Sequence, residues 1–160
     1  KALEGSIYMA YQPWFFNEMS KEVPNKKEIK NTIFMIIIGL FVSSFMLIFI
    51  SNNFFTYYVG DQFSDAVEIV PWIALAFAVN VIYTLANQIL LLTEKTGMIS
   101  IVTVLSVFIG IGITFIFVKW NGIYGAAQAF LVIMCLRAIL MVFISNRSYS
   151  MDWFKCKKND

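Results

Sequence analysis

The stretch IVPWIALAFAVNVIYTLANQILLL, residues 69–92, decides the fold of this chain. It contains no charged side chain, and a helix of this length crosses a hydrocarbon core of about 30 Å. Three further apolar stretches cover residues 33–50, 99–118 and 123–144. Lipid cannot pair with backbone polar groups, and these stretches lack the alternation of barrel strands, so they predict helices. The sequence therefore predicts an all-α fold, a polytopic transmembrane helical bundle of four full spans with a partial helix before them.

The composition excludes several classes of function. The chain is 59% hydrophobic and only 14% charged, whereas about a quarter of the residues of a soluble domain are charged. It has no His and only two cysteines, Cys135 and Cys156, so neither a metal cluster nor a His-based general base can be assembled. We therefore expect no enzyme activity, no cofactor, no metal and no nucleic-acid partner.

The basic residues divide the chain and predict its orientation. Residues 1–20 are expected to be the end of a truncated preceding helix or an interfacial helix, because the chain begins at Lys1 rather than Met and resembles a C-terminal piece. A basic cytoplasmic loop is expected at 21–32, the four-span bundle at 33–146 and a basic cytoplasmic tail at 147–160. Placing the first and third connections and the tail on one side puts nine basic residues there and only Lys119 opposite. The positive-inside rule makes that side cytoplasmic, and a bacterial inner membrane is the simplest fit.

Polar residues inside the spans are the candidate binding groups. Five of them recur at helical spacing on one face of the second span: Asn80, Tyr83, Thr84, Asn87 and Gln88. They predict either hydrogen bonding between helices or a wall that contacts sugars and water. The only charge inside the spans is Arg137, which is either a structural arginine or an anion-binding group lining a cavity.

Small residues predict close packing near the start of the last span. Gly125 and Ala129 are four residues apart, which is the spacing of a small-xxx-small contact between membrane helices. Pro71 is expected in the first turn of the second span, where its missing N–H costs no helical hydrogen bond.

Four segments together resemble a known family. They are Ala10-Tyr11-Gln12-Pro13; Tyr58-Val59-Gly60-Asp61-Gln62-Phe63-Ser64-Asp65-Ala66 with the following Ile69-Val70-Pro71; Thr93-Glu94-Lys95-Thr96-Gly97; and Asn121-Gly122-Ile123-Tyr124-Gly125-Ala126-Ala127. In this order, the set resembles the C-terminal third of polysaccharide or O-antigen flippases. These belong to the multidrug/oligosaccharidyl-lipid/polysaccharide exporter superfamily.

The resemblance implies a transporter that flips an undecaprenyl-diphosphate-linked oligosaccharide by alternating access. Its implied partners are the lipid-linked oligosaccharide, membrane lipids and the polysaccharide polymerase machinery. Arg137 would then meet the diphosphate, and the five polar residues of the second span would meet the sugars. Because the family often carries Asn where this chain has Gly110 and Gly112, the substrate wall is expected on the second and fourth spans. Glu4 is the only acidic candidate for ion coupling.

Two other functions remain open at this point. A multidrug exporter of the same superfamily would need an acidic or aromatic pocket, and the four spans contain no Asp or Glu. A non-transporting four-helix scaffold subunit would use the polar face of the second span only to hold helices together.

Overall fold

The chain folds into four helices. The computed structural model describes residues 2–54 and 64–149, and the side chains of 5–51 and 67–149. Helix α1 covers Ala2–Met19, α2 Lys26–Phe54, α3 Ser64–Leu92 and α4 Thr96–Ser148. The described residues contain no strand, which confirms the all-α prediction.

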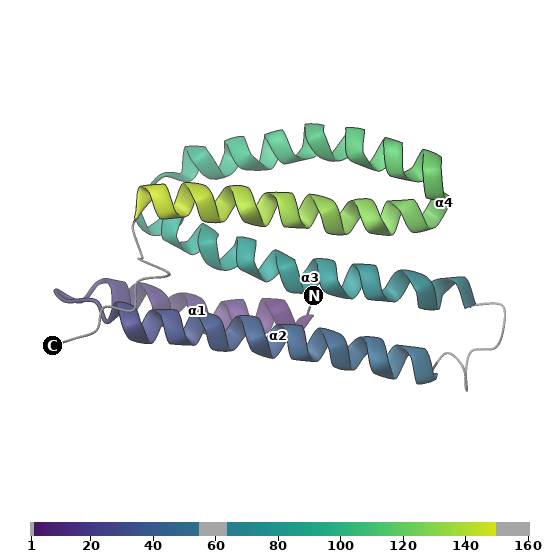
Figure 1. Cartoon of the computed structure of the whole chain (residues 1–160). Helices are drawn as coiled ribbons and strands as arrows, with labels where there is room; N and C mark the ends of the chain where they lie inside the picture. The colour runs from purple at the N-terminus through teal and green to yellow at the C-terminus, as the bar shows by residue number, and fades with distance from the viewer. Residues whose placement is uncertain (1, 55–63, 150–160) are drawn as a thin grey trace, which may run out of the picture.

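Helix α4 is interrupted at Gly122. This glycine has φ 57° and ψ −132°, a backbone conformation that residues with a Cβ rarely adopt. Figure 1 shows that the ribbon of α4 doubles back, so residues 96–121 and 123–148 form two neighbouring antiparallel halves. We call them the first and second halves of α4. Each contains one of the apolar stretches predicted at 99–118 and 123–144.

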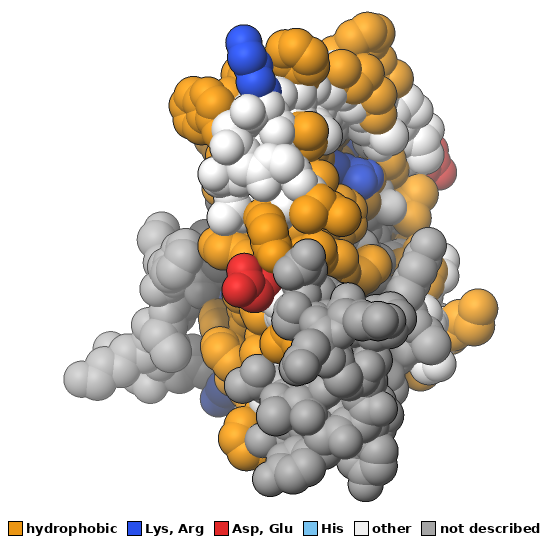
Figure 2. All heavy atoms as spheres, turned by 90° about the vertical axis from the view of Figure 1, so that its right-hand side faces the viewer, with side chains coloured by type: hydrophobic (Ala, Val, Ile, Leu, Met, Phe, Trp, Pro, Cys, Tyr) orange, Lys and Arg blue, Asp and Glu red, His pale blue; other side chains and the backbone are white. Residues whose placement is uncertain are grey.

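Three helices have the dimensions of membrane spans. The segments Lys26–Ser51, Val67–Leu92 and Thr96–Ser148 are long and apolar enough to cross a bilayer, as in a multi-pass membrane protein. Their outward side chains are apolar as well: Phe49, Phe108 and Phe115 are each at least 70% exposed. In the described part of the end that Figure 2 shows, hydrophobic side chains are far more numerous than charged ones.

Helix α3 lies at the centre of the bundle, between α2 and the second half of α4 (Figure 1). One of its sides packs in a cluster with α1 and α2: Tyr11, Phe15, Ile29, Ile33, Leu40, Val81, Leu85 and Ile89. Another side contributes Ala86 and Leu90 to a second cluster, with Met141 of α4. Phe15 is fully buried, so α1 is an integral part of this bundle.

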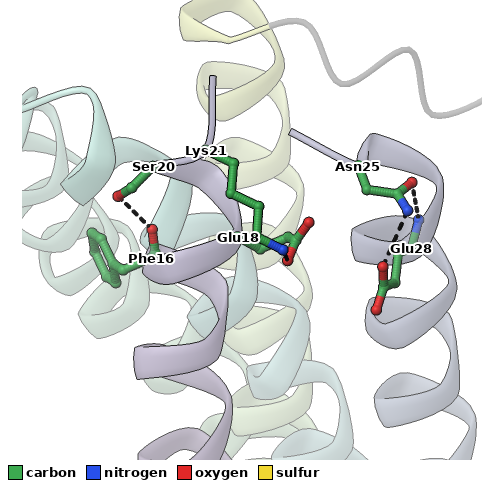
Figure 3. A network of polar contacts seen from close by, with 6 residues as sticks. All are labelled: Phe16, Glu18, Ser20, Lys21, Asn25 and Glu28. Atoms are coloured by element: carbon green, nitrogen blue, oxygen red, sulfur yellow. Dashed lines mark hydrogen bonds and ion pairs between the residues drawn. The ribbon is translucent and has the colours of Figure 1, made fainter. Parts of the chain in front are cut away.

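The turn between α1 and α2 is held by side-chain hydrogen bonds (Figure 3). Asn25 caps α2: its Oδ1 accepts from the Glu28 backbone N–H at 3.3 Å, and its Nδ2 donates to the Glu28 carboxylate at 3.1 Å. This reciprocal pair satisfies a helix-terminal donor in the manner of a capping box. On the α1 side, Lys21 forms an ion pair with the largely buried Glu18.

The basic connections meet at one end of the bundle. In Figure 1 the end of α1, the start of α2, the end of α3 and both termini of α4 lie at the same end. The Nζ of Lys26, at the start of α2, lies 4.9 Å from the ring centroid of Tyr149, which follows α4. The fold therefore groups the segments that carry Lys21, Lys26, Lys95 and Arg147, as the charge pattern predicted.

One sequence expectation is wrong and several lie outside the described structure. Pro71 lies in the interior of α3, because the helix begins at Ser64, within the polar segment before the apolar stretch. The side chain of Glu4, most of the Tyr58 to Ala66 segment and most of the 147–160 tail lie outside the described residues.

Candidate functional site

The five polar residues of the second predicted span share one side of α3. They all lie in an unbroken helix, and at about 100° per residue they occupy an arc of about 140°. Asn80, Tyr83, Thr84 and Asn87 are half-buried, and Gln88 is fully buried. We call these five residues the polar face of α3.

The amides of this face are incompletely paired. Neither Nε2 nor Oε1 of Gln88 has a hydrogen-bond partner among the described residues, and the same holds for the buried Oδ1 of Asn87. The Thr84 hydroxyl donates to the backbone oxygen of Asn80 at 3.1 Å, within the same helix. A buried polar atom without a partner costs about 1–3 kcal/mol. The polar face therefore retains hydrogen-bonding capacity that the described residues do not use.

Arg137 is brought to this face by the packing of α4 on α3. Its Cζ lies 4.2 Å from the ring centroid of Tyr83, in the geometry of a cation–π contact. Its Nε is buried and has no hydrogen-bond partner in the described part of the chain. Arg137 is half-buried, and its guanidinium lies beside Tyr83, at one edge of the polar face.

Arg137 also borders a cavity between the two halves of α4. This cavity has a volume of about 600 Å³, and its walls include Ile111, Phe115, Val118 and Ile133. Three hydroxyl residues of the first half line it as well, which are Thr103, Ser106 and Thr114. Gly110 lies among them, where an added Cβ would come within 3.3 Å of Ile133 Cδ1. A single arginine therefore connects the polar face of α3 with a second, hydroxyl-bearing surface.

The hydroxyl residues were missed by sequence reasoning. We expected the substrate wall on the second and fourth spans, yet the third predicted span supplies these side chains to the cavity of Arg137. Thr103 donates to the Ile99 carbonyl at 2.9 Å and Ser106 to the Val102 carbonyl at 2.6 Å, which leaves their oxygens as acceptors. Their spacing of three or four residues, continued by Gly110 and Thr114, was the available signal.

This arrangement brings one cation together with hydrogen-bonding side chains. Arg137 is the only charged residue among the cavity walls and the polar face. The Tyr83 ring lies against it, and Thr103, Ser106 and Thr114 line the same cavity, whose other walls are apolar. Within the described ranges, no group of three or more His, Cys, Asp or Glu could hold a metal ion. A guanidinium binds phosphate oxygens in a fork, and amides and hydroxyls pair with sugar hydroxyls.

Comparisons with known proteins do not identify the chain: no family model, no curated protein and no solved structure matches it. The resemblance to flippases therefore depends on the quoted sequence segments. One of them, Asn121 to Ala127, contains the turn at Gly122 that joins the two halves of α4.

Proposed function

We propose that the chain crosses a membrane four times, once each with α2, α3 and the two halves of α4. A straight helix of the 53 residues of α4 would be about 80 Å long, more than twice the thickness of a hydrocarbon core. Division at Gly122 makes two segments of about 39 Å, which suit one crossing each. The basic end would face the cytoplasm of a bacterial inner membrane, in agreement with the positive-inside rule.

We further propose that this bundle is part of a transporter that flips an undecaprenyl-diphosphate-linked oligosaccharide, an O-antigen or capsule repeat unit, by alternating access. The observation that carries the proposal is the position of Arg137 over Tyr83, between the polar face and the largely apolar cavity to which Thr103, Ser106 and Thr114 contribute hydroxyls. In this role Arg137 binds the diphosphate, and the half-buried Asn80, Thr84 and Asn87 pair with sugar hydroxyls. Gln88 is fully buried and offers no surface to a ligand. The order of the flippase-like segments supports the same assignment.

The test uses the full-length protein in a bacterial strain that lacks its own flippase. Arg137→Ala removes the only cation of the site, and Asn87→Leu removes an amide whose oxygen has no described partner. Both variants should reduce the display of surface polysaccharide while the protein remains at its normal level in the membrane. Lys119→Gln is the matched control, because it removes an exposed cation near the turn at Gly122 and should leave display unchanged.

The outcomes separate this proposal from its alternatives. Normal display in both variants would overturn the site assignment, and loss of protein from the membrane instead of loss of display would favour a scaffold held together by the polar face. Resistance to cationic drugs on expression, without complementation of polysaccharide display, would favour a multidrug exporter.

A further inference from the structure

A second groove lies at the basic end of the bundle, away from the Arg137 cavity. It has a volume of about 460 Å³ and is bordered by the start of the first half of α4 and the end of the second half. Its lining combines two cations, Lys95 and Arg147, with the apolar side chains of Met98, Ile101, Phe143 and Ile144. Arg147 follows Arg137 by ten residues, which is about 15 Å along the helix.

The two cations reach this groove from distant parts of the chain. Lys95 is the residue before α4 begins, and Arg147 lies in its last turn. Both are exposed, and neither forms an ion pair with an acid of the described residues; Glu94, beside Lys95, is also exposed. Fold-back of α4 therefore concentrates positive charge that no described carboxylate neutralises.

The remaining walls of the groove continue into the apolar outer surface. Ile101 is 66% exposed and Phe143 is 67% exposed, so both present large hydrocarbon area outward. A free phosphate or a sugar phosphate would gain nothing from these side chains. A ligand with an anionic head and a hydrocarbon chain matches both parts of the groove, since basic pockets at the ends of membrane helices suit anionic lipid headgroups.

We propose that this groove binds an anionic phospholipid. The headgroup phosphate lies between Lys95 and Arg147, and an acyl chain follows Ile101 and Phe143 down the outer surface of α4. This lipid would bind across the two ends of α4 and stabilise its hairpin. The site does not depend on the transport function proposed for Arg137.

Native mass spectrometry of the full-length protein in a neutral detergent tests the proposal, with phosphatidylglycerol and phosphatidylcholine of identical acyl chains as probes. Phosphatidylglycerol should bind and phosphatidylcholine should not. Each cation near an anionic lipid contributes about fivefold in affinity, so Lys95→Gln with Arg147→Gln should weaken binding about 25-fold. The charge-conserving pair Lys95→Arg with Arg147→Lys should retain it.

The matched control is Lys27→Gln with Lys119→Gln, which removes the same charge from exposed positions outside the groove. Equal weakening in this control would overturn the site, as would unchanged binding in the Lys95 and Arg147 double variant. Equal binding of phosphatidylcholine would overturn recognition of the charge. Competition by inorganic phosphate as strong as that by phosphatidylglycerol would overturn recognition of a lipid.

Discussion

Arg137 lies over the aromatic ring of Tyr83, with its Cζ 4.2 Å from the ring centroid. The contact joins the second half of α4 to α3, and it places the only charge of the apolar stretches beside the polar face of α3. A cation–π contact removed from water contributes up to about 2 kcal/mol. It therefore lowers the cost of holding a guanidinium in an apolar bundle while leaving its N–H groups as donors.

The coupling between these two residues is measurable by a double-mutant cycle. Tyr83→Leu, Arg137→Met and the double variant should give a coupling free energy of about 0.5–2 kcal/mol in unfolding experiments. Tyr83→Phe should retain most of it, because the ring face remains. If Tyr83→Phe and Tyr83→Leu destabilise the protein equally, the ring is not what holds the arginine.

The buried amide of Gln88 should lower the stability of the bundle. Both of its side-chain polar atoms are buried without a described partner, so Gln88→Met should raise the free energy of unfolding by about 1–2 kcal/mol. Gln128→Met is the matched control and should give no gain, because Gln128 accepts a hydrogen bond from Asn121 at 3.1 Å. Thermal unfolding in detergent measures the stability of both variants. Destabilisation by Gln88→Met would mean that the amide of Gln88 has a partner outside the described residues.

Gly125 should tolerate no side chain. An added Cβ would lie 1.9 Å from the backbone oxygen of Phe117, in the opposite half of α4, where the clash cannot be relieved by a rotamer change. Gly125→Ala should therefore lower the free energy of unfolding by about 3 kcal/mol. Gly112→Ala has open space around it and should be neutral or stabilising by about 0.5–1 kcal/mol. Equal melting temperatures of the two variants would contradict the close approach of the two halves.

Gly122 should be required for the turn of α4 for a different reason. Space is available around it, but its positive φ is strained for any residue with a Cβ. Gly122→Ala should cost about 1–3 kcal/mol, whereas Gly39→Ala, in the interior of α2 with no atom within reach, should cost nothing. Thermal unfolding of both variants is the measurement, and an unaffected Gly122→Ala protein would contradict this backbone conformation.

Much of the helical architecture could be predicted from sequence patterns. Hydropathy located the apolar parts of α2, α3 and both halves of α4, because a helix that is apolar on most sides has a one-dimensional signature. Helical spacing likewise placed the five polar residues on one side of α3. The ends of the helices were harder to predict. Helix α3 begins at Ser64, so Pro71 lies inside it, because hydropathy does not indicate how far a helix extends into a polar segment.

The sequence by itself determined that the chain is helical and apolar, which residues share a face, and where positive charge recurs. Only the tertiary structure decided which residues lie close together across helices. Arg137 lies over Tyr83, Thr103 and Ser106 line the Arg137 cavity, and Lys95 and Arg147 border one groove. The members of each set lie far apart in the sequence. Their proximity in space depends on the rotation of each helix about its axis and on the fold-back at Gly122. Periodicity shows which residues of one helix share a face. The packing of the helices determines which face of a neighbouring helix lies against it.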